Sequence, residues 1–116
     1  MAKTITKPRF SGFRQFLKLQ KNERTGSYYS AFTENFSSFI LINQISKIYF
    51  CGVETDSCIF KTAIDSFERG IEPVIIEDAC FSAGGQQAHD AGIFLLKRNI
   101  GKNQIQMSDQ VIEKMS

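Results

Sequence analysis

From about residue 33 to its end, the chain alternates segments of helical spacing with short apolar runs. The runs at 47–51 and 73–78 predict two buried strands, and 104–106 predicts a short third strand. Helices are predicted before, between and after these strands, with Gly70 and Gly101 as stop signals. Strands that alternate with helices are typical of a parallel sheet, because each parallel connection needs a crossover. The sequence therefore predicts an α/β fold: a parallel sheet with helices on both faces.

The amino-terminal part of the chain has a different character. With 116 residues the chain is sized for one domain, and its first 24 residues hold seven Lys or Arg against the single acid Glu23. We expect 1–27 to form a basic segment that precedes a domain over 28–116. No buried strand is predicted in this segment, although Phe10, Phe13, Phe16, Leu17 and Leu19 suit a short amphipathic helix.

Composition excludes several classes of protein. A net charge of +2 is too small to indicate a nucleic-acid partner, and no apolar run approaches the roughly 20 residues of a membrane span. Cys51, Cys58 and Cys80 are an odd number without paired spacing, which argues against a disulfide framework and a zinc site. We expect a cytoplasmic protein without metal or cofactor.

Cys58 is the residue best placed for chemistry. It lies between the first predicted strand and a helix that Thr55 or Asp56 can cap, so its sulfur falls at the positive end of the helix dipole. That position favours the thiolate, which is the nucleophilic form. The backbone N–H of Cys58, with that of a preceding residue such as Glu54, is a natural donor to an oxyanion.

Several linked motifs resemble the isochorismatase-like cysteine hydrolases, a superfamily that includes nicotinamidases and related amidases. The run from Ile48 to Asp65 is similar to the segment that carries the nucleophile of that family. The other similar motifs are Tyr29-Ser30-Ala31-Phe32 upstream and Ile76-Glu77-Asp78-Ala79-Cys80, Ser82 and His89 downstream.

The resemblance implies a three-layer α/β/α fold in which Cys58 is the nucleophile toward a small amide. It also implies a cis peptide between Val53 and Glu54, which would add the Glu54 N–H to the oxyanion hole. In the family an aspartate on the first strand and a lysine before the Tyr-Ser-Ala-Phe motif assist the cysteine. Lys21 is the nearest candidate for that lysine, and Lys18 is the alternative.

The chain departs from the family in its first part. No aspartate precedes Asp56, and His89 is the sole histidine, so the Asp-x-His metal site of nicotinamidases has no counterpart. The chain therefore resembles the carboxyl-terminal portion of a family domain without its first strands. An uncovered sheet edge favours a homo-oligomer. The alternative to an amidase is an inactive remnant that serves as a binding or oligomerisation module.

Other residues near Cys58 have plain structural roles as alternatives. His89 is either a base or a structural histidine, and Cys80 lines a pocket or packs inertly. Asp56 suits helix capping and Asp78 suits a turn or a supporting hydrogen bond. The glycines of Ala83-Gly84-Gly85 leave a third function class open, a nucleotide site in which this loop holds a phosphate.

Overall fold

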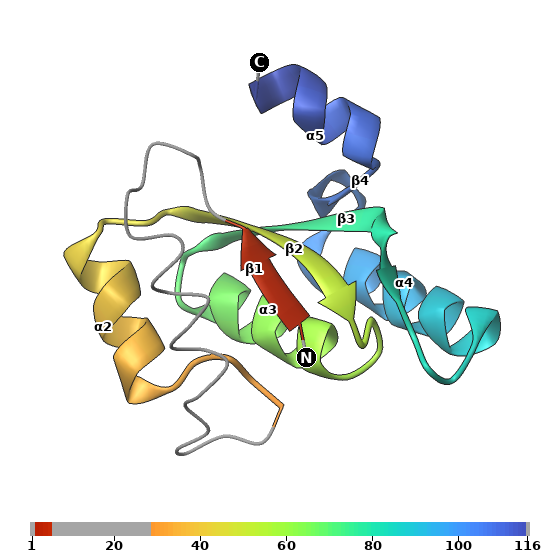
Figure 1. Ribbon diagram of the computed structural model, residues 1–116, viewed down its shortest axis with the longest axis horizontal. Coiled ribbons are helices and arrows are strands. Elements are labelled where there is room, and N and C mark those ends of the chain that lie inside the picture. The colour runs from red at the N-terminus through yellow and green to blue at the C-terminus, as the bar shows by residue number, and fades with distance from the viewer. Residues whose placement is uncertain (1, 6–28, 116) are drawn as a thin grey trace.

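Four strands in the order β1-β2-β3-β4 organise the chain in the computed structural model, which describes residues 2–5 and 29–115 (Figure 1). The strands are β1 (Ala2–Ile5), β2 (Lys47–Val53), β3 (Glu72–Phe81) and β4 (Ile105–Gln106). The helices are α2 (Glu34–Ile42), α3 (Cys58–Glu68), α4 (Gln86–Ile100) and α5 (Ser108–Met115), with a 3₁₀ turn at Lys102–Gln104.

The three strands predicted from the apolar runs pair in parallel, which confirms the predicted fold class. β2 pairs with β3, and β3 pairs with β4. β1 was not predicted and runs antiparallel to β2, with Ala2 opposite Gly52 and Ile5 opposite Tyr49. Because this pairing joins distant parts of the chain, no local sequence pattern predicts it.

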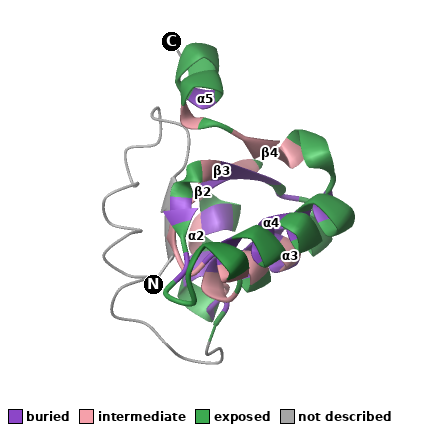
Figure 2. Ribbon diagram, turned by 90° about the vertical axis from the view of Figure 1, so that its right-hand side faces the viewer, coloured by how far each residue is buried: buried purple, intermediate pink, exposed green. Residues whose placement is uncertain are grey.

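Side chains that alternate along β2 and β3 divide the core between the two faces of the sheet. Ile48, Phe50 and Ile75 are fully buried in the larger cluster, together with residues of α2, α3 and α4. Tyr49 and Val74 point to the opposite face, where they form a smaller cluster with Ile76 and with Val111 of α5. Helices thus pack on both faces, and the buried residues lie along the strands and the inner sides of the helices (Figure 2).

Local signals explain where the helices begin and end. The Thr33 hydroxyl accepts a hydrogen bond from the N–H of Phe36 and so caps α2. Gly85 and Gly101 flank α4 with φ angles of 93° and 98°, a region that suits glycine. The predicted cap of α3 is wrong, because Ser57 stands at that position and neither Thr55 nor Asp56 caps the helix.

The Tyr-Ser-Ala-Phe motif packs on α3. The N–H of Ala31 donates a 3.0 Å hydrogen bond to the hydroxyl of Thr62, and the Ser30 side chain hydrogen-bonds to Asp65. This motif therefore lies against the helix that Cys58 opens. The amphipathic helix predicted over 10–19 lies outside the described residues. None of the helices that the structure describes is long and apolar enough to cross a membrane.

Candidate active site

Cys58 is the first residue of α3, a helix of 11 residues. Its side chain is partly buried and packs against the larger core cluster. The peptide bond between Val53 and Glu54 is cis, as the resemblance implies. No hydrogen bond of the described residues uses the N–H of Cys58 or that of Glu54, whereas the Glu54 carbonyl accepts from Ser57 and Ile59. Two backbone donors next to the thiol are therefore unoccupied within the described part of the chain.

The nucleophile loop, residues 54–57, connects β2 to this cysteine. It is attached at three successive residues to the segment that runs from the end of β3 into α4. The Glu54 carboxylate accepts from the Ala83 N–H at 2.5 Å. The N–H of Thr55 donates to the Phe81 carbonyl at 3.1 Å. The Asp56 carboxylate accepts from the Ser82 hydroxyl at 2.8 Å.

Thr55 and His89 form a fourth attachment, through their side chains. The Thr55 hydroxyl lies 2.8 Å from Nδ1 of His89, and the two residues are 0% and 8% exposed. Thr55 therefore binds α4 instead of capping α3. His89 has the structural contact that was one of its two predicted roles, since its ring is fixed against the nucleophile loop.

The glycine loop at 83–85 does not present free backbone donors. The N–H groups of Ala83, Gly84 and Gly85 donate to the Glu54 carboxylate, the Ser82 hydroxyl and the Ser82 carbonyl respectively. A phosphate cradle needs such N–H groups to face a ligand. The glycines of this loop therefore serve a tight turn whose N–H groups bind within the protein, and the loop does not offer them to a phosphate.

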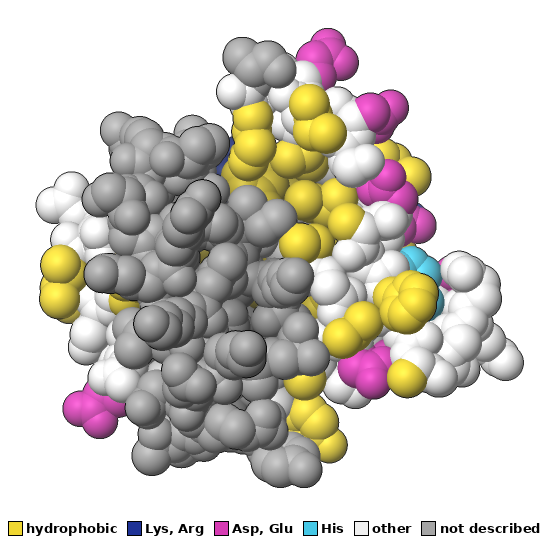
Figure 3. Space-filling model, viewed as in Figure 1, with side chains coloured by type: hydrophobic (Ala, Val, Ile, Leu, Met, Phe, Trp, Pro, Cys, Tyr) yellow, Lys and Arg dark blue, Asp and Glu magenta, His cyan; other side chains and the backbone are white. Residues whose placement is uncertain are grey.

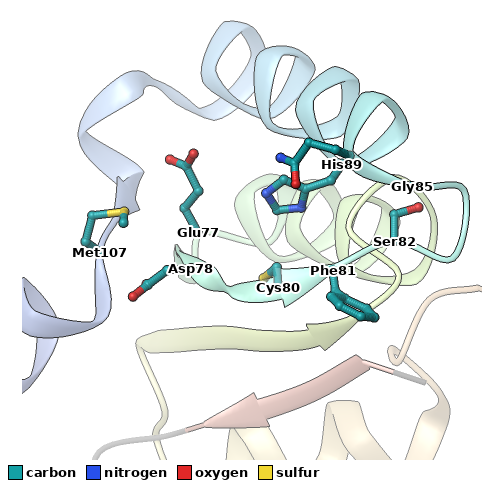
Figure 4. Close-up of a pocket in the computed structure, with 9 residues that line it drawn as sticks. Glu77, Asp78, Cys80, Phe81, Ser82, Gly85, His89 and Met107 are labelled. Atoms are coloured by element: carbon teal, nitrogen blue, oxygen red, sulfur yellow. The ribbon is translucent and has the colours of Figure 1, made fainter.

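A cavity of about 490 Å³ opens at the carboxyl end of β3, on the side of α4. The side chains of Glu77 and His89 project into the space between β3 and α4 (Figure 4). On the face shown in Figure 3, acidic side chains gather beside the histidine. Cys58 is not among the residues that line this cavity.

Asp78 and Cys80 also line this cavity. The Asp78 carboxylate accepts from the hydroxyl and the N–H of Ser108, and these hydrogen bonds lower its pKa. This is the supporting hydrogen bond predicted for Asp78. Burial and, to a smaller extent, the neighbouring Cys51 raise the pKa of the Cys80 thiol to about 12. Cys80 is therefore an inert thiol at neutral pH.

The structure does not describe the lysines that are predicted to assist Cys58. Lys21 and Lys18 lie outside the described part of the chain. Among residues 2–5 and 29–115, no group of three or more His, Cys, Asp or Glu is arranged to hold a metal ion.

Sequence patterns did not reveal the contacts that hold the nucleophile loop. Thr55 and His89 are 34 positions apart, and the capping preference of threonine suggested a different partner. Gly92 was also missed: a Cβ at this position would lie 3.0 Å from Cα of Asp56, so α4 packs directly on the loop backbone. Thr55 and Asp56 meet His89 and Gly92 only in the folded protein, where α4 packs on the loop that follows β2.

Comparisons with known proteins agree with this architecture. A family model described as the isochorismatase domain matches residues 2–108. The ureidoacrylate amidohydrolase RutB of Azorhizobium caulinodans is 27% identical over 97 residues, which are 84% of this chain and 35% of that protein.

Two solved structures are similar in fold. An isochorismatase-like hydrolase from Alkaliphilus metalliredigens superposes with a TM-score of 0.68 at 19% identity, over 81% of this chain and 53% of that chain. The nicotinamidase/pyrazinamidase PncA of Bacillus subtilis superposes with a TM-score of 0.62 at 25% identity, over 77% and 52%. The chain thus spans about half the length of these structures. The solved structures share the fold of this chain. From the family match over residues 2–108, we conclude that this chain belongs to the isochorismatase domain family.

Proposed function

We propose that the chain is a cysteine hydrolase that cleaves the carbon–nitrogen bond of a small amide, with the Cys58 thiolate as nucleophile. The observation that carries the proposal is the position of Cys58 as first residue of α3, where the N–H groups of Cys58 and Glu54 have no acceptor among the described residues. The positive end of the helix dipole favours the thiolate. We propose that the N–H groups of Glu54 and Cys58 donate hydrogen bonds to the oxyanion.

The proposed reaction has two steps. The sulfur attacks the carbonyl carbon, and the carbonyl oxygen takes up negative charge as the tetrahedral intermediate forms. That intermediate collapses to a thioester, the carbon–nitrogen bond breaks, and the nitrogen leaves as an amine after it takes up a proton. Water then attacks the thioester, releases the acid and returns the sulfur as a thiolate.

A nearby cation and a proton shuttle complete such a site. We propose Lys21 as the cation, with Lys18 as the alternative, because a positive charge near the sulfur stabilises the thiolate. No aspartate precedes Asp56 to act as the shuttle. We therefore expect slow turnover by this chain compared with a site that holds all three groups.

The names of two relatives supply the first substrates to test. Purified chain is incubated with nicotinamide or with ureidoacrylate, and release of ammonia or of the carboxylic acid is measured. Cys58→Ala and Cys58→Ser are the comparison variants. We expect hydrolysis that depends on Cys58. Background rates that are equal in wild type and Cys58→Ala would exclude the amidase.

A catalytically inactive oligomerisation module is the second candidate. It is favoured by the absence of an early aspartate and by exposed apolar side chains on the outer side of α4, where Phe94 is 61% exposed and Leu95 44%. In this case the chain associates with a second copy of itself. Light scattering on the purified chain, and on a Phe94→Lys/Leu95→Lys variant, tests it: a wild-type monomer contradicts the oligomer.

A further inference from the structure

The segment that holds the nucleophile loop is continuous in sequence. It comprises residues 81–92, which we call the clamp: the end of β3, the 82–85 turn and the first two turns of α4. Its attachments to the loop are the three at Glu54, Thr55 and Asp56 described above, together with the pair of side chains Thr55 and His89.

Within the clamp, His89 is itself firmly placed. Its backbone N–H donates to the Gly85 carbonyl at 3.1 Å, so it belongs to the first turn of α4. Gly92 lies three residues further along the same helix, on the same face. Because a Cβ at Gly92 would come within 3.0 Å of the Asp56 backbone, that helix face rests directly on the loop.

Thr55 receives this support at two points. Its N–H is held by the Phe81 carbonyl and its hydroxyl by His89, so both its backbone and its side chain are fixed. Thr55 is fully buried, and water does not replace a lost partner there without rearrangement. The residues between Thr55 and Cys58 are few, so the orientation of the Cys58 thiol and N–H depends on this anchor.

We propose that His89 is a positioning residue that acts through Thr55 to set the reactivity of Cys58. His89 does not meet the reacting atoms in this role; it holds the nucleophile loop in the geometry that stabilises the thiolate. The consequence for amide hydrolysis rests on the proposed function above. The consequence for the thiol itself does not, because a thiolate also reacts with simple alkylating reagents.

The test is the rate at which iodoacetamide alkylates Cys58, followed by peptide mass spectrometry over a range of pH. Thr55→Val removes the hydroxyl at nearly constant shape, and Thr55→Ser is the matched control that retains it. His89→Asn removes the ring from the other side of the contact. Cys51 and Cys80 report in the same experiment whether the protein stays folded.

We expect Thr55→Val and His89→Asn each to slow alkylation of Cys58 at neutral pH by about fivefold or more, the effect of roughly 1 kcal/mol. Thr55→Ser should stay near the wild-type rate, and the double variant should be no slower than either single one, because both remove one contact.

If folded Thr55→Val and His89→Asn alkylate Cys58 at the wild-type rate, the proposal is overturned and the Thr55–His89 contact is purely structural. The proposal is also overturned if the two substitutions slow alkylation additively in the double variant. If Thr55→Val does not fold, His89→Asn carries the test, since it leaves the loop sequence intact. Absence of amide hydrolysis in the wild type would sink the proposed function alone, because the labelling needs no substrate.

Discussion

The hydroxyl of Ser82 donates a 2.8 Å hydrogen bond to the carboxylate of Asp56 and so joins the end of β3 to the nucleophile loop. The same oxygen accepts from the Gly84 N–H at 3.1 Å. Ser82 is only 9% exposed, so these two contacts are largely shielded from water. One hydroxyl thus holds the loop before Cys58 and the turn before α4 in a fixed relation.

Ser82→Ala should therefore lower the free energy of unfolding by about 1–3 kcal/mol, because Asp56 and Gly84 both lose a shielded partner. Urea denaturation measures the change. Ser38→Ala on the exposed side of α2 is the matched control and should have little effect. Equal stabilities of the two variants would show that the Ser82 contacts contribute nothing.

Gly92→Ala tests how closely α4 packs on the loop. Alanine favours a helix over glycine by up to about 1 kcal/mol, but its Cβ would meet the Asp56 backbone at 3.0 Å. We expect the clash to dominate and to cost about 1–3 kcal/mol. Gln87→Ala at an exposed position of the same helix is the control. A Gly92→Ala protein more stable than wild type would contradict the close packing.

The Cys80 thiol should make stability fall in alkali. Its pKa is raised from 9.0 to about 12, chiefly by burial, and its Sγ donates to the Phe50 carbonyl at 3.7 Å. Below about 9 the thiol is neutral in both the folded and the unfolded chain. Between about 9 and about 12 the unfolded chain loses its proton first, so the folded state is progressively disfavoured.

Cys80→Ser does not ionise in this range and should lose less stability over the same interval. The measurement is the free energy of unfolding of both proteins at several alkaline pH values, each relative to its own value at neutral pH. Parallel curves for the two proteins would contradict the raised pKa of Cys80.

Asp65 should stabilise the fold above acid pH. Burial alone would raise its pKa, but hydrogen bonds from Lys61 and Ser30 and the charges of Lys61 and Arg69 together lower it below 3.8. A lowered pKa in the folded state gives stability that is present above the unfolded value and is lost as pH falls through the folded one. Asp65→Asn should therefore cost about 1 kcal/mol at neutral pH and less in acid.

Thermal unfolding of Asp65→Asn and wild type from neutral to acid pH tests this expectation. Glu68→Gln, an exposed substitution on the same helix, is the control. A stability difference that stays constant down to the lowest pH at which both proteins fold would contradict the lowered pKa.

Much of the architecture was predictable because it depends on local sequence patterns. Apolar spacing and glycine stop signals predicted α3 and α4, and short apolar runs predicted β2 and β3. The position of Cys58 at a helix start followed from the same patterns. The unpredicted strand β1 forms only by pairing with β2, which is far away in sequence.

The surroundings of Cys58 were less predictable because their contacts are non-local. Thr55 and Asp56 have side chains that often cap a helix, yet in the fold they bind His89 and Ser82. The glycine loop at 83–85 has the composition of an anion site, yet its N–H groups bind Glu54 and Ser82. In each case tertiary contact overrides a local preference.

Capture of the acyl intermediate tests the central claim most directly. The chain is mixed with a small amide that it hydrolyses, or with an activated ester of the corresponding acid, quenched in acid and digested for mass spectrometry. We predict an acyl group on the peptide that contains Cys58, and no such group in Cys58→Ala. Acylation confined to Cys51 or to lysines, or no acylation of the folded chain, would contradict Cys58 as the nucleophile.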